Sequence, residues 1–145
     1  MPNNLQNVIT EQLKNEVFQI LVVDDDELNQ MIISELLKKW NTHAEYATSG
    51  EQALEIVHKH PERFDLILMD VHLPQMNGME TTLELRTKFA LNIPIIALTA
   101  DSMNDTRQNI LKAGMNDVVI KPLKPDNFHK TLGYYLKLRL DAKNV

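Results

Sequence analysis

Five short apolar segments, separated by stretches with helical periodicity, constrain the fold of this chain more than any other feature. The segments are 18–23, 44–47, 66–69, 93–98 and 118–120. Their starts lie about 20 to 30 residues apart, the length of one strand plus a crossover helix. The first, third and fourth are continuously apolar, as expected of strands buried on both faces. This alternation predicts an α/β fold with an open, largely parallel sheet and helices on both of its faces.

Helical patterns fill the gaps between these segments. The first helix repeats apolar residues from Leu28 to Leu36, and the last carries Phe128 and Leu132 on one face. A weaker, polar helix is expected over 82–89, and a further one over 105–113. The residues expected to cap the helices are Asp26, Ser49 (with Gln52 in a capping box), Gly114 (at a C-terminus) and Asp126.

Composition excludes several classes of function. The chain has 145 residues, the size of one domain, and 43% of them are hydrophobic. Its 15 basic and 20 acidic side chains give a net charge of −5, the wrong sign for a protein that binds nucleic acid through its phosphates. It has no cysteine, so thiolate metal sites and thiol nucleophiles are excluded. The sequence shows neither a signal peptide nor a membrane-spanning segment, and we therefore expect a cytoplasmic protein.

Polar side chains with complementary chemistry follow four of the predicted strands. Asp24 and Asp25 follow the first, Asp70 the third, Thr99 the fourth and Lys121 the fifth. Ligands of open parallel sheets bind beyond the carboxyl ends of the strands. If the first and third strands are neighbours, their carboxylates converge, and Mg²⁺ would relieve the repulsion between them.

Such a site suits phosphoryl chemistry. A carboxylate can accept the phosphoryl group, while Thr99 and Lys121 contact its oxygens. Each residue alone has a simpler interpretation: an aspartate after a strand is most often a helix cap, and Lys121-Pro122 is usually only a turn. Their joint placement at the ends of the strands favours the functional interpretation.

The residues at these positions resemble the receiver domains of response regulators in two-component signalling. The resemblance rests on residues 20–25, 65–70, 73–78, 95–100 and 121–122 and covers about 18–138. Asn29 and the Pro-x-Met-x-Gly loop are most similar to receivers of hybrid sensor histidine kinases. The resemblance implies a flavodoxin-like, doubly wound sheet with strand order 2-1-3-4-5.

The resemblance also implies roles for individual residues. Asp70 would be the phosphoacceptor, Thr99 the switch hydroxyl and Lys121 the cation that pairs with the phosphoryl group. We expect Lys121 to gain a strong partner only when phosphate arrives, and the Lys121-Pro122 peptide bond to be cis. The expected Mg²⁺ ligands are Asp25, Asp70 and the main-chain carbonyl of His72 directly, and Asp24 through water.

Two departures from the family pattern concern switching and phosphate lifetime. Val118 stands where the family commonly has an aromatic residue, so we expect a smaller conformational change around it. His72 and Asp101 occupy the two positions that influence the lifetime of the phosphoryl group in the family. The lifetime of the phosphoryl group on this chain therefore does not follow from the resemblance.

The leading hypothesis is a signalling switch that takes its phosphoryl group from a phosphohistidine on a histidine kinase or phosphotransfer domain. Its only catalysis would be its own phosphorylation and dephosphorylation. A receiver of a hybrid kinase and a free-standing regulator both remain open. A metal-dependent phosphohydrolase is disfavoured, because His72 stands where an acid–base aspartate is needed. A degenerate receiver is disfavoured by the complete set of site residues.

The sequence pattern and the resemblance together divide the chain into three parts. We expect residues 1–17 to be a linker or an extra helix, 18–140 the receiver domain, and 141–145 a tail. Weak homodimer contacts are expected through the face made by the fourth helix, fifth strand and fifth helix. No direct contact with nucleic acid or membrane is expected.

Overall fold

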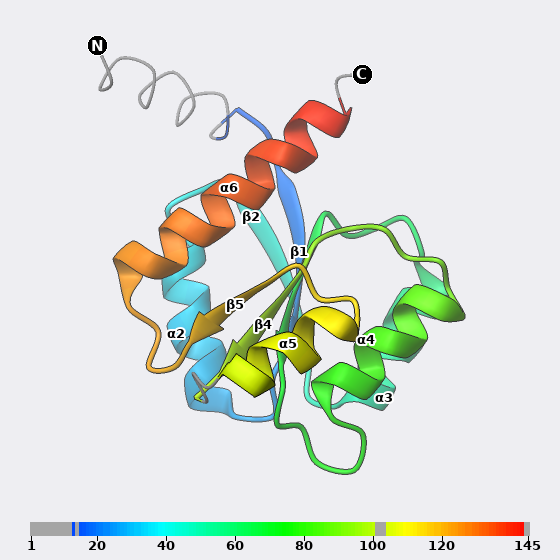
Figure 1. The fold of residues 1–145 in the computed structure, drawn as a ribbon. Coiled ribbons are helices and arrows are strands. Elements are labelled where there is room, and N and C mark those ends of the chain that lie inside the picture. The colour runs from blue at the N-terminus through cyan, green and yellow to red at the C-terminus, as the bar shows by residue number, and fades with distance from the viewer. Residues whose placement is uncertain (1–12, 14, 101–103, 144–145) are drawn as a thin grey trace.

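The computed structural model describes residues 13, 15–100 and 104–143, which form a parallel sheet between two layers of helices (Figure 1). The strands are β1 (Phe18–Val23), β2 (Thr42–Ala47), β3 (Leu66–Asp70), β4 (Ile95–Thr99) and β5 (Asp117–Ile120). The helices are α2 (Glu27–Leu37), α3 (Gly50–Lys59), α4 (Gly78–Thr87), α5 (Asn104–Lys112) and α6 (Pro125–Lys143). The strand order is β2-β1-β3-β4-β5 and every pair is parallel, which confirms the predicted fold.

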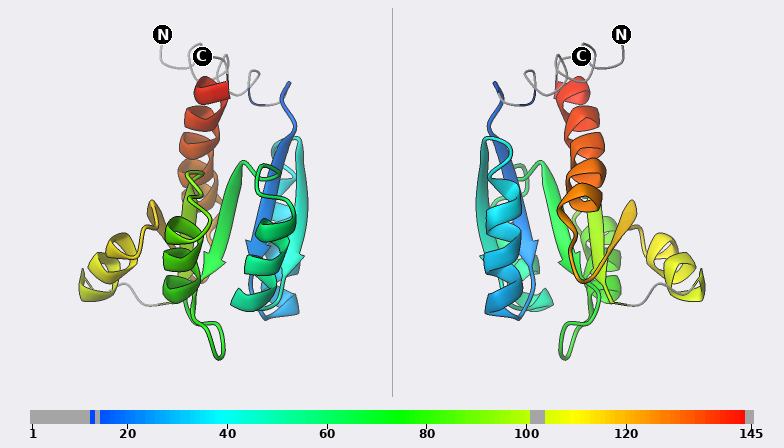
Figure 2. Two further views of the ribbon diagram at one scale, coloured as in Figure 1. Left: turned by 90° about the vertical axis from the view of Figure 1, so that its right-hand side faces the viewer. Right: turned by 90° about the vertical axis from the view of Figure 1, so that its left-hand side faces the viewer.

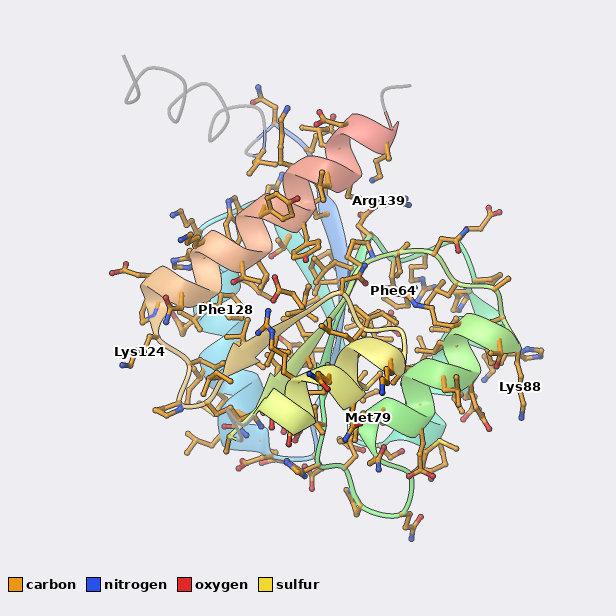
Figure 3. The ribbon with its side chains drawn as sticks, in the orientation of Figure 1. Phe64, Met79, Lys88, Lys124, Phe128 and Arg139 are labelled. Atoms are coloured by element: carbon orange, nitrogen blue, oxygen red, sulfur yellow. The ribbon has the colours of Figure 1, made fainter. Side chains whose placement is uncertain are left out.

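The three central strands are buried on both faces, so their side chains build two separate cores. Leu21 and Met69 belong to the core beneath α3, α4 and α5, whereas Ile20 and Leu68 belong to the core beneath α2 and α6. Alternation along each strand therefore divides one continuous apolar run between two helix layers. Figure 3 labels a member of each layer, Met79 on α4 and Phe128 on α6.

The starts of the first two helices agree with the sequence prediction. The side chain of Asp26 accepts a hydrogen bond from the Leu28 N–H at 2.8 Å, and Ser49 Oγ accepts one from the Gln52 N–H at 3.0 Å. The reciprocal bond of the expected capping box is made differently. Gln52 Oε1 accepts from the Thr48 N–H at 2.7 Å, one residue before the cap.

Two other helix starts differ from the prediction. Helix α4 begins at Gly78, four residues before the expected start, with Asn77 and Glu80 forming a capping box. Helix α6 begins at Pro125, so Asp126 lies inside its first turn and is not its cap. Proline suits this position because the first turn of a helix leaves its N–H groups unpaired in any case. Gly114, beyond the end of α5, has a φ of 105°, as expected of a C-terminal cap.

A group of ion pairs and hydrogen bonds joins α6 to the beginning of β3. The buried Asp65 carboxylate accepts hydrogen bonds from Arg139 Nε at 3.2 Å and from the Gln19 N–H at 2.8 Å. Lys143 Nζ lies 2.7 Å from the same carboxylate. Figure 2 shows the C-terminal end of α6 beside the beginning of β1, at the end of the sheet opposite the strand ends that carry the predicted site.

Residues 1–12 and 14 of the predicted N-terminal linker or helix, and the last two residues of the predicted tail, lie outside the described residues. Leu13, the first described residue, is 3% exposed and belongs to the core beneath α6. None of the described helices combines the length and apolarity that crossing a bilayer requires.

Candidate functional site

Three aspartates meet where β1 and β3 end. Val23 is paired with Met69 in the sheet, so the residues that follow each of them emerge side by side. Each of Asp24, Asp25 and Asp70 offers an oxygen atom, and these atoms lie within 4.8 Å of one another. Asp24 is fully buried and Asp70 is 5% exposed, whereas Asp25 faces solvent. The sequence prediction that these carboxylates converge is therefore confirmed.

Lys121 extends from the end of β5 into the same cluster. Its Nζ atom lies 3.3 Å from Asp24 Oδ2 and 3.4 Å from Asp70 Oδ2. Its backbone is fixed by a hydrogen bond from its N–H to the Thr99 carbonyl at 2.8 Å, and the peptide bond to Pro122 is cis, as expected. The expectation that the ammonium lacks a strong partner before phosphate arrives is wrong, because two carboxylates already flank it.

Burial dominates the electrostatics of Asp24. The loss of hydration raises the pKa of its carboxyl above the ordinary value, and the charge on Asp70 acts in the same direction. The hydrogen bond from the Asp26 N–H to Asp24 Oδ1 at 2.9 Å and the charge of Lys121 oppose this rise. A buried carboxylate of this kind gains from any cation that approaches it.

The remaining side chains of the site lie around Asp70. Thr99 is fully buried at the end of β4, and its Oγ1 lies 3.5 Å from His72 Nε2. The His72 N–H donates to Asp70 Oδ1 at 3.0 Å and so helps to orient the carboxylate. The role of the His72 carbonyl as a metal ligand stays a prediction. Asp101 lies outside the described residues.

Sequence reasoning missed two groups that support the site. Gln30 Nε2 donates to the Asp24 carbonyl at 2.7 Å, which ties the first turn of α2 to the end of β1. Gly78 packs directly on the main chain of Asp70. The Pro-x-Met-x-Gly loop is the signal that marks Gly78, although the sequence alone does not show which atoms it touches.

The donor set suits a small, hard divalent cation. Three carboxylates within 4.8 Å of one another supply the oxygen ligands that Mg²⁺ prefers, and the exposed Asp25 leaves a side open to water. A divalent cation would also offset the cost of a buried, charged Asp24. The residues present therefore fit the expected metal.

Comparison with known proteins decides the family. Residues 20–133 match the model of the response regulator receiver domain family. The chain is a receiver domain. Its fold, its acidic cluster and its relatives identify it as the phosphoryl-accepting unit of a two-component phosphorelay.

The relatives of the receiver domain include parts of larger proteins. It is 40% identical over 125 residues to the autoinducer 2 sensor kinase/phosphatase LuxQ of Vibrio vulnificus, a match that covers 86% of this chain and 14% of LuxQ. It is 34% identical to the receiver domain of the sensor histidine kinase PA1611 of Pseudomonas aeruginosa, whose structure holds a magnesium ion in its active-site cleft. That match has a TM-score of 0.73 and covers 83% of this chain and 98% of the other.

A third similar structure is a complex. The receiver domain of the response regulator Ssk1 of Saccharomyces cerevisiae was solved together with the histidine phosphotransfer protein Ypd1. It is 25% identical to this receiver domain, with a TM-score of 0.77, over 86% of this chain and 94% of the other. Receivers of this family accept phosphoryl groups from histidine kinases and histidine phosphotransfer proteins.

Proposed function

We propose that Asp70 is the phosphoacceptor of this receiver domain. The observation that carries the proposal is the position of its carboxylate, 3.4 Å from Lys121 Nζ and grouped with Asp24 and Asp25 at one edge of the sheet. Asp24 is fully buried and its main-chain carbonyl is tied to Gln30, whereas Asp70 retains a small exposed fraction. A phosphoryl group therefore has better access to Asp70 than to Asp24, and Lys121 lies close enough to pair with it.

In the transfer step an Asp70 oxygen bonds to the phosphorus atom as the bond from phosphorus to the donor imidazole nitrogen breaks. The imidazole leaves with the electron pair of that bond and takes up a proton. Lys121 pairs with a phosphoryl oxygen, and the Thr99 hydroxyl donates to another. Asp25, Asp70 and the main-chain carbonyl of His72 would hold Mg²⁺ directly and Asp24 would hold it through water, and the bound ion would supply positive charge that offsets the negative charge of the phosphoryl group.

We infer that the donor is a phosphohistidine on a partner protein and that the partner docks on α2. This helix starts beside the acidic cluster and exposes three apolar side chains, Leu28 by 63%, Met31 by 66% and Ile32 by 40%. A partner that covers them brings its histidine to the strand ends while it buries apolar area. The Ypd1–Ssk1 complex supports a histidine phosphotransfer protein as one such partner.

The context that we propose is the receiver of a hybrid sensor kinase, because LuxQ and PA1611 are both sensor kinases. A free-standing regulator is the alternative. The full-length reading frame distinguishes the two directly.

Phosphorylation by acetyl phosphate tests the assignment of Asp70. With Mg²⁺ present, mass spectrometry should detect one added phosphoryl group, and Asp70→Asn should abolish it. Asp26→Asn is a suitable control, because Asp26 caps α2 and lies outside the carboxylate cluster. Labelling of Asp70→Asn to the wild-type extent would refute the assignment.

A further inference from the structure

Gly78, the first residue of α4, lies in contact with the main chain of Asp70. A β-carbon added at Gly78 would lie 2.2 Å from the Asp70 carbonyl oxygen and 3.0 Å from its carbonyl carbon. It would also lie 3.0 Å from Met69 Cγ. These distances are too short for any side chain, so the beginning of α4 sits on Asp70 only because residue 78 is glycine.

Hydrogen bonds and packing hold both Gly78 and the main chain of Asp70 in place. The Gly78 N–H donates to the Val71 carbonyl at 3.0 Å, and the Val71 N–H donates to the Leu98 carbonyl at 3.0 Å. The capping box made by Asn77 and Glu80 fixes the first turn of α4. Strand β3 is buried along its whole length between β1 and β4. A substitution at Gly78 therefore moves the main chain of Asp70 or displaces the start of α4.

We propose that Gly78 is a positioning residue for phosphoryl transfer. The start of α4, seated on the Asp70 carbonyl, fixes the main chain from which the carboxylate extends toward Lys121 and Asp24. This inference rests on the proposed function of Asp70 as the phosphoacceptor. Displacement of a reacting group by about 1 Å can cost on the order of 100-fold in rate, so a β-carbon at Gly78 should slow phosphorylation strongly.

Two other glycines supply matched controls. A β-carbon at Gly50 would meet Thr81 Oγ1 at 2.2 Å and the Met76 carbonyl at 3.1 Å, a contact as close as that of Gly78 but with no atom of Asp70. A β-carbon at Gly133 would have only an ordinary contact, with Trp40 Cζ2 at 3.6 Å. Gly50→Ala therefore crowds the first turn of α4 through Thr81 without placing an atom against Asp70, and Gly133→Ala makes the same chemical change inside α6.

The experiment measures the initial rate of phosphorylation by acetyl phosphate at saturating Mg²⁺. The temperature is one at which circular dichroism shows that each variant is folded. Gly78→Ala is expected to lower the rate by about 10-fold to 100-fold. Gly50→Ala should lose thermal stability and lower the rate less than Gly78→Ala does, because it places no atom against Asp70. Gly133→Ala should leave the rate unchanged and raise the thermal stability, because alanine replaces a glycine inside α6. In the amide NMR spectrum, Gly78→Ala should also shift the His72 N–H, which reports on Asp70 Oδ1.

The outcomes separate the inference from the function on which it rests. A wild-type rate for folded Gly78→Ala overturns the inference while Asp70→Asn still abolishes labelling. Labelling of Asp70→Asn overturns the proposed function instead. If Gly78→Ala does not fold, even when combined with Gly133→Ala, Asn77→Ala decides the question, because it loosens the same helix start without adding an atom against Asp70. A several-fold lower rate for Asn77→Ala supports the inference, and an unchanged rate overturns it.

Discussion

The Nζ atom of Lys121 lies 3.4 Å from Asp70 Oδ2, so the proposed phosphoacceptor is paired with a cation before any phosphoryl group arrives. The same ammonium is 3.3 Å from Asp24. Lys121 therefore has a role in the unphosphorylated state, where it offsets two carboxylates. We propose that on phosphorylation its partner changes from a carboxylate oxygen to a phosphoryl oxygen.

Lys121→Arg should separate these two roles. Arginine retains the positive charge beside Asp24 and Asp70, so we expect the variant to keep its fold. Its planar guanidinium does not replace the compact ammonium beside a phosphoryl oxygen, so the response to phosphorylation should be lost. Mass spectrometry verifies the label, and amide NMR with and without beryllofluoride measures the response. A response of wild-type size would contradict this role for Lys121.

Mg²⁺ should stabilise the folded chain. At a concentration of one hundred times its dissociation constant, one bound ion contributes about 2.7 kcal/mol. Asp25→Asn should abolish this gain, and the metal-free variant should be at least as stable as wild type, because one of three clustered charges is removed. Thermal unfolding with and without Mg²⁺ measures both effects, and the gain should weaken in acid as protons compete for the carboxylates. An unchanged Mg²⁺ response in Asp25→Asn would exclude Asp25 as a ligand.

Tyr135 should make the fold sensitive to alkali. Burial and the neighbouring Asp117 raise the pKa of its hydroxyl to about 12, from an ordinary value of 10.0. The unfolded chain ionises first, so stability is fully present below pH 10 and falls as the pH rises from 10 to 12. The Tyr135 hydroxyl also donates to Asp117 Oδ2 at 3.2 Å. Urea unfolding should show a smaller loss across this range for Tyr135→Phe than for wild type, and equal losses would contradict the assignment.

A charge introduced on the exposed face of α2 should slow phosphoryl transfer from a partner protein but not labelling by acetyl phosphate. Met31→Glu is expected to slow transfer from a phosphorylated histidine phosphotransfer protein by about 10-fold, which corresponds to roughly 1.4 kcal/mol of lost docking energy. Labelling by acetyl phosphate should stay unchanged, because Met31 lies outside the acidic cluster. Leu138→Glu on α6 is the matched control, since Leu138 is also exposed, by 46%. Equal transfer rates for the two variants would place docking elsewhere.

The sequence was sufficient to predict which side chains meet at the site. Asp24, Asp70, Thr99 and Lys121 each end or follow a predicted apolar strand, and a parallel sheet brings all such ends to one edge. The start of α4 was missed because residues 78–81 show no apolar periodicity. The capping pair of Asn77 and Glu80 was nevertheless visible in the sequence.

Other features depend on contacts that no local pattern encodes. Arg86 is half-buried, and burial lowers its pKa below the ordinary value. Its guanidinium donates to the carbonyls of Leu91, Ile93 and Gly114 at 2.6 to 3.0 Å. Because these acceptors are main-chain atoms of two separate loops, residue types alone did not reveal them. The pairing of Lys121 before phosphorylation was missed for a related reason, since it depends on the distances between strand ends.

Phosphorylation of the site depends on the register of the sheet, so it can be used to measure correct folding. Asp70 is paired with Leu98, and Thr99 with Ile120. A slip of one residue along either ladder would turn Asp70 or Thr99 toward the opposite face of the sheet. A compact chain with misaligned strands would thus bury its apolar residues and still fail to become labelled. The fraction of chains that acetyl phosphate can label therefore measures the fraction whose strands are in register. Spectroscopic measures of helix content do not report this fraction.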